Sequence, residues 1–276
     1  MTNGHRIAKI LHDDGIRRIA FLPYKREMAD SLISVVCACQ RLAMTVGVFP
    51  VGYTADGEHR LEFPESKEEF NPEEWGAVVY HNPYDDSNMV TEVDERFHSD
   101  RMKGKTTLVY IPYYCGYSDI GFKTKPGVRN ADYIFCDPVD EVEYQMLYPD
   151  KKIIGVESPK MDTIEEGEGD YTLVCTSLIP FLEKRHLKFA EYRWAVFQHE
   201  KVIFRPHPLM EETIKALAPN CIDEWRELIR DIEAAGIEID ATDNVGKTFA
   251  RCKFLITDFS SIVRMWEKTG KPIQIL

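Results

Sequence analysis

The sequence lacks the cysteine patterning of a disulfide-bonded or zinc-binding protein. Its seven cysteines are an odd number, and only Cys37 and Cys39 lie close together. It has no CxxC pair and no cysteine–histidine spacing typical of zinc. These absences favour a reducing compartment, so we expect a cytoplasmic protein, with the inner face of the membrane as the alternative location. They also lead us to expect no metal and no cofactor.

Long apolar runs and an excess of basic residues are absent too. The longest apolar stretch, around 33–39, is too short to span a bilayer, and the N-terminal residues show no cleavage signal. With 34 basic and 46 acidic residues, the formal net charge is −12. Because nucleic acids and anionic membranes are negative, we expect no nucleic-acid partner and at most a peripheral membrane association. A phosphorylated ligand would need a local cluster of donors.

What the chain does contain is a repeated strand–helix rhythm. At 276 residues it is long for a single domain. Residues 18–22 suit a buried strand, apolar residues from Met28 to Ala43 follow helical spacing, and a second apolar run follows at 46–53, which together predict a βαβ unit. Further strands are predicted within 76–84, 106–114, 131–137 and 151–158, and the polar segment 54–74 is read as a surface excursion.

A second series of strands and helices begins after an acidic, glycine-containing segment, "DTIEEGEGD", at 162–170. We interpret this segment as a linker. The sequence therefore predicts two Rossmann-like α/β domains facing a cleft, at 1–163 and 164–276. In the second domain the expected strands are 171–177, 201–208, 237–242, 253–258 and 271–276, and the expected helices are 180–199, 209–217, 222–235, 245–252 and 260–270.

The residues that follow each strand of the second domain are the candidates for ligand binding. In an open parallel sheet, ligands lie beyond the carboxyl ends of the strands, where loops lead into helices. The polar residues at these positions are Thr176, Ser177, Arg205, His207, Thr257, Asp258, Ser260 and Ser261.

Ser260 and Ser261 stand where a predicted strand passes directly into a predicted helix. Unpaired backbone N–H groups and a partial positive charge at a helix start attract phosphate, and the two hydroxyls would add donors. The alternative is that Asp258 or Ser260 caps the helix. Asp258 would repel a phosphate, so we expect it to cap or to orient a neighbour.

Arg205 and His207 lie two residues apart in "FRPHP", so they share one face of a strand. An arginine fork suits a phosphate, and a histidine can donate to a phosphate oxygen or protonate a leaving group. We therefore expect His207 to be catalytic as well as donor-binding. The alternative is a structural histidine held between two prolines.

In the first domain, His81 follows a predicted strand within "YHNPYDDSN" and is the candidate general base. A turn explains most of this segment, because Asn-Pro and Asp-Asp-Ser-Asn are turn formers. A metal at Asp85 and Asp86 is a weaker alternative. Tyr113 and Tyr114 could line the same site or simply pack.

The order of "CTS", "FRPHP" and "LITDFSSIVRMWEKTGKPIQIL" resembles the nucleotide-binding domain of the CDP-glycerol glycerophosphotransferases, the teichoic-acid primases and polymerases. The similarity extends upstream through "ADYIFCDPVDEVEYQMLYPDKKIIGVESPKMD" and covers most of residues 17–276. The resemblance implies two Rossmann-like domains of GT-B type, an N-terminal acceptor-side domain at 1–163 and a C-terminal nucleotide-donor-binding domain at 164–276. It further implies that a histidine-proline motif and an Asp-aromatic-Ser-Ser motif hold the activated donor. It also implies a transferase of cell-wall teichoic acid biosynthesis that uses CDP-glycerol or a related nucleotide-diphosphate donor and a polyol-phosphate or glycan acceptor.

Two departures from this family bear on activity. The polymerases carry a Trp-His-Gly motif whose histidine is assigned as the base, whereas the corresponding segment here, "IPYYCGY", has no histidine. The family also continues past the Lys-Pro strand, so we expect a second domain truncated at its C-terminal end. Two alternatives therefore stay open: another GT-B nucleotide-sugar transferase or epimerase, and a non-catalytic nucleotide-binding module.

Overall fold

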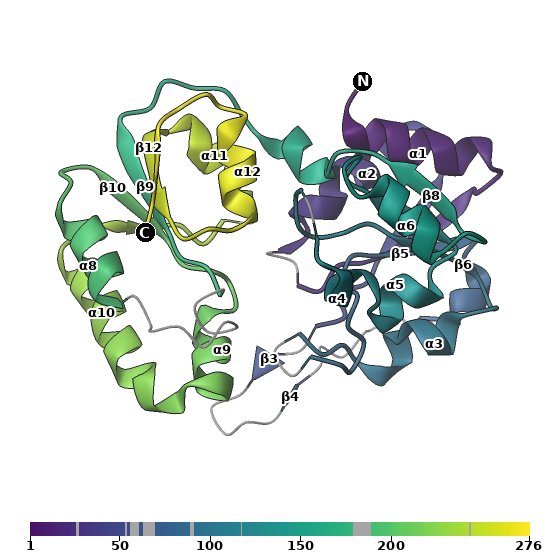
Figure 1. The fold of residues 1–276 in the computed structure, drawn as a ribbon, viewed down its shortest axis with the longest axis horizontal. Coiled ribbons are helices and arrows are strands. Elements are labelled where there is room, and N and C mark those ends of the chain that lie inside the picture. Colours follow the sequence, from purple (N-terminus) through teal and green to yellow (C-terminus); the bar gives the residue numbers. More distant parts are fainter. Residues whose placement is uncertain are drawn as a thin grey trace. The chain divides into compact units, whose positions relative to one another are not determined.

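The computed structural model describes residues 1–25, 28–52, 54–55, 61–62, 70–88, 91–116, 118–178, 189–242 and 244–276. It divides into two compact units, Met1–Asp162 and Thr163–Leu276. Each unit is built around its own parallel sheet (Figure 1). The α/β class and the two parallel sheets predicted from the sequence are confirmed. None of the helices in the described ranges is long and apolar enough to cross a membrane.

The first unit contains a six-stranded sheet in the order β2-β1-β5-β6-β7-β8. A separate antiparallel pair, β3-β4, lies in the segment predicted as a surface excursion. In chain order the elements are α1 (Asn3–Asp13), β1 (Arg18–Leu22), α2 (Asp30–Arg41), β2 (Thr45–Val48), β3 (Thr54–Ala55), β4 (Leu61–Glu62), β5 (Ala77–Tyr80), α3 (Ser99–Met102), β6 (Thr107–Tyr110), α4 (Ile120–Lys123), α5 (Pro126–Asn130), β7 (Tyr133–Cys136), α6 (Glu141–Leu147) and β8 (Lys152–Gly155), with short 3-10 turns at Pro72–Glu74, Glu95–Phe97 and Pro159–Thr163.

Helices α1 and α2 cover one face of this sheet. Ile7 and Leu11 of α1 pack with Leu32 and Val35 of α2 against the sheet. Helix α1 is not among the elements that the sequence analysis predicted. Its first backbone N–H groups, at residues 3 and 4, donate to the carboxylate of Asp162 over 2.9 and 2.7 Å, which ties the two ends of the unit together.

The second unit contains a five-stranded parallel sheet in the order β11-β10-β9-β12-β13. Its elements are β9 (Tyr171–Cys175), α8 (Phe189–Phe197), β10 (Val202–Arg205), α9 (Met210–Leu217), a 3-10 turn at Pro219–Cys221, α10 (Ile222–Ala234), β11 (Glu238–Ile239), α11 (Val245–Ala250), β12 (Cys252–Thr257), α12 (Ser261–Glu267) and β13 (Ile273–Ile275). These match the expected series, except that residues 180–188 of the helix predicted at 180–199 lie outside the described residues.

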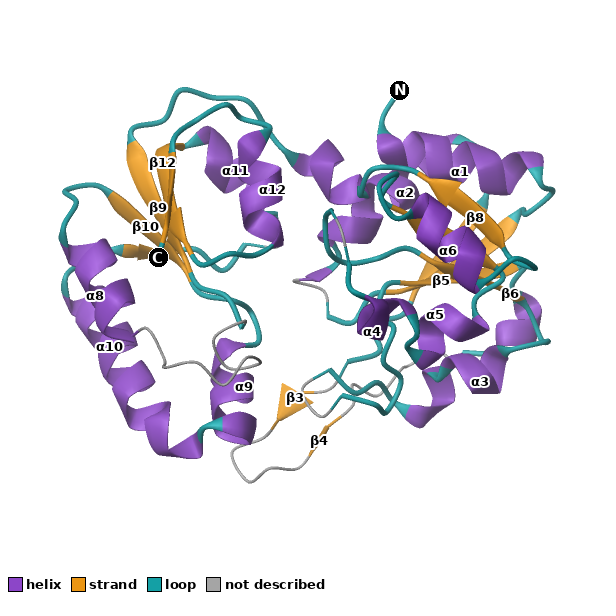
Figure 2. Ribbon diagram, in the orientation of Figure 1, coloured by secondary structure: helices purple, strands orange, loops and turns teal. Residues whose placement is uncertain are grey.

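Helices cover both faces of this second sheet. Figure 2 shows α8 and α10 beside one face and α11 and α12 beside the other. On the first face, Phe189 and Trp225 pack against the sheet, and on the second the rings of Phe249 and Trp266 meet edge to face at 4.9 Å. Such two-sided burial explains why the strands of this unit read as nearly continuous apolar runs.

The segment interpreted as a linker, 162–170, packs along α11. The backbone N–H of Glu165 donates to the carbonyl of Gly246 at 3.3 Å, and the N–H of Gly169 donates to the carbonyl of Ala250 at 3.1 Å. The approach is close enough to require glycine, because a Cβ on Gly169 would lie 1.8 Å from the carbonyl group of Arg251. Residues 163–170 therefore belong to the packed second unit.

We expect Gly169→Ala to lower the free energy of unfolding by about 2 kcal/mol, because the added methyl group forces the backbone of the segment away from α11. Urea unfolding followed by tryptophan fluorescence measures the change. Glu166→Ala, an exposed substitution in the same segment, is the matched control and should stay within about 0.5 kcal/mol of the wild type. Equal stabilities for the two variants would contradict the packed arrangement.

Candidate functional site

The second sheet reverses its direction of winding between β9 and β12. From β9 the chain builds outward through β10 and β11, and it then returns to the other side of β9 to form β12 and β13. In sheets of this kind, ligands bind beyond the carboxyl ends of the strands at the point of reversal. Cys175 pairs with Arg205 on one side and with Thr257 on the other, so the residues that follow these three strands share one edge. The structure thus brings together the three segments predicted to bind a donor.

Thr176 and His207 are joined across β9 and β10. The backbone N–H of His207 donates to Oγ1 of Thr176 at 3.0 Å, and the N–H of Leu209 donates to Nδ1 of His207 at 3.1 Å. Because Nδ1 accepts, the neutral imidazole carries its proton on Nε2. The half-buried His207 is therefore set up as a donor through Nε2.

Asp258 connects the loops that follow β9 and β12. Its side chain is only 3% exposed. Its Oδ2 accepts a hydrogen bond from the backbone N–H of Ser177 at 3.1 Å and another from the hydroxyl of Tyr192 in α8. Of the two roles considered for this aspartate, the structure shows that of orienting its neighbours.

Ser260 and Ser261 lie beside this carboxylate at the start of α12. Ser260 occupies the N-cap position with an extended backbone, yet within the described residues its side chain makes no capping hydrogen bond. Both serines are half-buried, whereas Thr257 is fully buried and its Oγ1 has no hydrogen-bond partner in the described part of the chain. The two serine hydroxyls therefore stand at the sheet edge, and Thr257 lies beneath it.

The guanidinium group of Arg205, which the sequence analysis expected to bind a phosphate, is instead bonded to residues that follow β11. Its Nη1 donates to the carboxylate of Asp240 at 2.7 Å and to Oγ1 of Thr242 at 3.2 Å, and its Nη2 donates to the carbonyl of Thr242 at 2.8 Å. The reason is that Asp240 directly follows β11, the strand next to β10. Arg205 thus joins two strand ends and neutralises a buried carboxylate.

His81 is a structural residue in this fold, which corrects its assignment as a base. Its ring is 1% exposed, Nε2 accepts from the N–H of Tyr24 at 2.7 Å, and Nδ1 lies 2.8 Å from Oγ of Ser31. Burial, together with the nearby ammonium group of Lys160, lowers the pKa of His81 to about 3. A neutral imidazole with both nitrogens engaged has no site left to take a proton from an acceptor.

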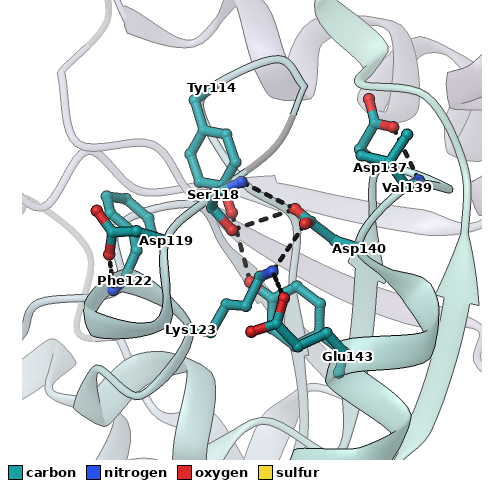
Figure 3. Close-up of polar contacts among 10 residues, drawn as sticks. Tyr114, Ser118, Asp119, Phe122, Lys123, Asp137, Val139, Asp140 and Glu143 are labelled. Atoms are coloured by element: carbon teal, nitrogen blue, oxygen red, sulfur yellow. Dashed lines mark hydrogen bonds and ion pairs between the residues drawn. The ribbon is translucent and has the colours of Figure 1, made fainter.

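Figure 3 shows how the segment "IPYYCGYS" of the first unit is held, the segment that stands where the resembling family carries its Trp-His-Gly motif. The backbone N–H and Oγ of Ser118 donate to Asp140 at 3.1 and 3.2 Å. The ammonium group of Lys123 lies between Asp140 and Glu143, at 2.7 and 2.5 Å. Tyr114 extends toward the same cluster, and its hydroxyl lies 3.4 Å from that of Tyr144. A buried ion pair therefore shapes this loop.

Asp85, a weaker candidate for metal binding, is buried and structural. Its two carboxylate oxygens accept from the N–H and Oγ of Ser99 at 3.1 and 2.7 Å, while Asp86 is exposed. Among the residues that the structure describes, no group of histidine, cysteine and carboxylate side chains could hold a metal ion.

Sequence reasoning missed Tyr192 and Asp240 as members of this sheet edge. Tyr192 lies inside a predicted helix, 66 residues before its partner Asp258, so nothing local pointed to it. Asp240 carried a usable signal, because it follows the apolar residue Ile239 of the strand predicted at 237–242 and directly follows β11, just as Asp258 directly follows β12. Both side chains fix other members of the site.

Two comparisons with known proteins found no match: no family model and no curated protein is similar to this chain at significance. Similar solved structures do exist. The S. aureus MnaA–UDP co-structure aligns with a TM-score of 0.51 at 13% identity, over 95% of this chain and 79% of that one. The wall teichoic acid polymerase TagF aligns with a TM-score of 0.47 at 11% identity, over 99% of this chain and 73% of that one. The similarity to MnaA shows the fold alone, which is two Rossmann-like domains of GT-B type.

We expect Asp258→Ala to destabilise the protein by about 2–4 kcal/mol, because it leaves the N–H of Ser177 and the hydroxyl of Tyr192 buried without their acceptor. Tyr192→Phe removes one of these donors and should cost only about 1 kcal/mol. Urea unfolding of the two variants and the wild type measures both values. If Asp258→Ala proves as stable as Tyr192→Phe, the carboxylate does not hold the two loops together.

The buried state of His81 predicts a specific dependence of stability on pH. The folded-state pKa of about 3 lies below the ordinary value of 6.5, so the unfolded chain binds a proton first as the pH falls. Stability contributed by neutral His81 is then lost below pH 6.5 at about 1.4 kcal/mol per pH unit.

The variant His81→Gln isolates this effect, because all other titrating groups are shared with the wild type. The advantage of the wild type over His81→Gln in urea unfolding should shrink by about 2 kcal/mol between pH 7 and pH 5. A difference that stays constant over this interval would show that His81 titrates normally in the folded state.

Proposed function

We propose that this protein transfers glycerol phosphate from CDP-glycerol, or a closely related nucleotide-diphosphate donor, to a polyol-phosphate or glycan acceptor of a cell-surface polymer. The observation that carries the proposal is the convergence of the loops after β9, β10 and β12. This convergence places His207, Ser260 and Ser261 at one edge, at the point where the sheet reverses its winding. The order of these motifs along the chain adds support, because it is the order in the resembling family.

The donors at this edge suit a diphosphate. In the proposal, Nε2–H of His207 and the hydroxyls of Ser260 and Ser261 donate to its oxygens. Asp258 is 3% exposed, and its Oδ2 accepts hydrogen bonds from Ser177 and Tyr192 of the same unit. A local set of donors is what a phosphorylated ligand requires in a protein whose formal charge is −12.

The proposed reaction is a displacement at phosphorus. An acceptor hydroxyl attacks the phosphorus that carries glycerol, a new P–O bond forms, and the bond from this phosphorus to the bridging oxygen breaks. The bridging oxygen leaves with CMP, and the proton of the acceptor hydroxyl is released to water. His207, donating through Nε2, stabilises the negative charge that develops on the transferring group and on the leaving CMP oxygen.

One observation favours a second candidate function, a nucleotide-binding module without turnover. His81, predicted as the base, is buried with both ring nitrogens engaged, and "IPYYCGY" holds no histidine. Other GT-B nucleotide-sugar transferases and epimerases use the same fold for different reactions, so the donor itself must be tested.

We expect the protein to release CMP from CDP-glycerol in the presence of a polyol-phosphate acceptor, and His207→Ala to lower the rate about 100-fold or more through loss of a donor to the transition state. Tyr113→Phe, which removes an aromatic hydroxyl in the first unit, is the matched control and should lose much less. Chromatographic quantification of CMP gives both rates. Unchanged transfer by His207→Ala would rule out the mechanism.

A donor panel separates the alternatives. Thermal stabilisation by CDP-glycerol above UDP- and GDP-linked donors supports the proposed substrate, and preference for a UDP- or GDP-linked sugar identifies another GT-B enzyme. Tight nucleotide binding without any CMP release identifies the binding module.

A further inference from the structure

Phe259 stands out because its ring lies in solvent among buried neighbours. It is 71% exposed, more than any other phenylalanine, tyrosine or tryptophan that the structure describes. The residue before it, Asp258, is 3% exposed, and Ser260 after it is half-buried. The apolar strand β12 therefore ends by presenting one aromatic ring at the sheet edge where the candidate site lies.

The ring is not required by the core of its unit. The face of the sheet beneath α12 is already filled by Phe249 and Trp266, which are both fully buried. An exposed aromatic side chain gains none of the burial energy that normally accounts for an aromatic residue. Core packing therefore does not account for the position of Phe259.

The backbone on both sides of Phe259 is held in place. Asp258 is anchored to the loop after β9 through Ser177 and to α8 through Tyr192. On the other side, α12 begins at Ser261, two residues later. The ring is thus carried by a short turn between two fixed points, which limits the conformational freedom that a ligand would have to remove on binding.

We propose that Phe259 is the platform on which the base of the bound nucleotide stacks, an inference that rests on the proposed function. A nucleoside diphosphate joins a hydrated anionic diphosphate to a flat aromatic base. The hydroxyls of Ser260 and Ser261 match the first part, and the exposed ring immediately before them matches the second. Because every base has an aromatic face, stacking supplies affinity with little discrimination among bases.

The exposed aromatic residues of α8, Trp194 and Phe197, do not share this setting. They lie on the outer side of the helix near the ion pair between Arg193 and Asp231, and no residue of the candidate site lines that surface. Phe197 is therefore a suitable control, since it is an exposed phenylalanine of the same unit.

Calorimetric titration of the full chain with CDP and with inorganic pyrophosphate tests the proposal, because pyrophosphate lacks the base. Phe259→Ala should weaken CDP binding about 5- to 150-fold, the range that base–aromatic stacking supplies. Its affinity for pyrophosphate should remain that of the wild type. Phe259→Trp should retain or strengthen CDP binding, and Phe197→Ala should leave both affinities unchanged.

Two results overturn the inference while leaving the proposed function in place: CDP affinity unchanged in Phe259→Ala, or an equal loss of affinity for CDP and for pyrophosphate. If the wild-type chain binds CDP no more tightly than it binds pyrophosphate, the nucleoside adds no affinity and a stacking site is also excluded. A wild-type chain that binds neither CDP nor any other nucleotide overturns the proposed function itself and the stacking inference with it.

Discussion

The parallel pairing that sets Cys175 between Arg205 and Thr257 is the constraint on which the second unit depends. The register of the strands is set by backbone hydrogen bonds, and it decides which residues lie side by side where the strands end. Residues separated by more than 80 positions in the chain, such as Ser177 and Asp258, become bonded neighbours as a result. The candidate site follows from this alignment and from the reversal of winding between β9 and β12.

The two acidic side chains at this edge, Asp240 and Asp258, accept hydrogen bonds from neighbouring segments of the same unit. Asp240 accepts from Arg205, from the hydroxyl of Thr248 and from the N–H of Thr242, and Asp258 accepts from the loop after β9 and from α8. Buried carboxylates left unpaired would be costly, and paired ones hold loops together. In the proposed function, the groups that donate to the ligand are therefore the hydroxyls of Ser260 and Ser261 and the imidazole of His207. The exposed ring of Phe259 lies next to the two serines in the chain.

Most of the fold could be predicted because its periodic signals are strong. The buried strands are apolar runs, and α9 and α10 carry clear helical spacing with Gly236 at the end, where its φ of +69° suits glycine. Helix α1 and the close packing of the segment 162–170 were not predicted, because their causes are not local. Helix α1 depends on packing against α2 and on the carboxylate of Asp162, far along the chain. The segment 162–170 was interpreted as a linker because it contains glycines, which flexible segments also contain. In the structure these glycines allow close packing against the end of α11, and the sequence alone does not distinguish the two uses of glycine.

The sequence by itself determined where the candidate ligand-binding residues lie. The alternation of strands and helices is a local signal, and it is enough to place Thr176, His207 and Ser260 after the carboxyl ends of their strands. Tertiary structure alone decided what each polar group does. Arg205 faces an aspartate from the neighbouring strand, and His81 is enclosed by Tyr24 and a serine of α2, so neither is available in the way its sequence neighbourhood suggested. The physical reason is that spacing along the chain fixes the face and level of a side chain, whereas its hydrogen-bond partners and burial come from segments that only folding brings near.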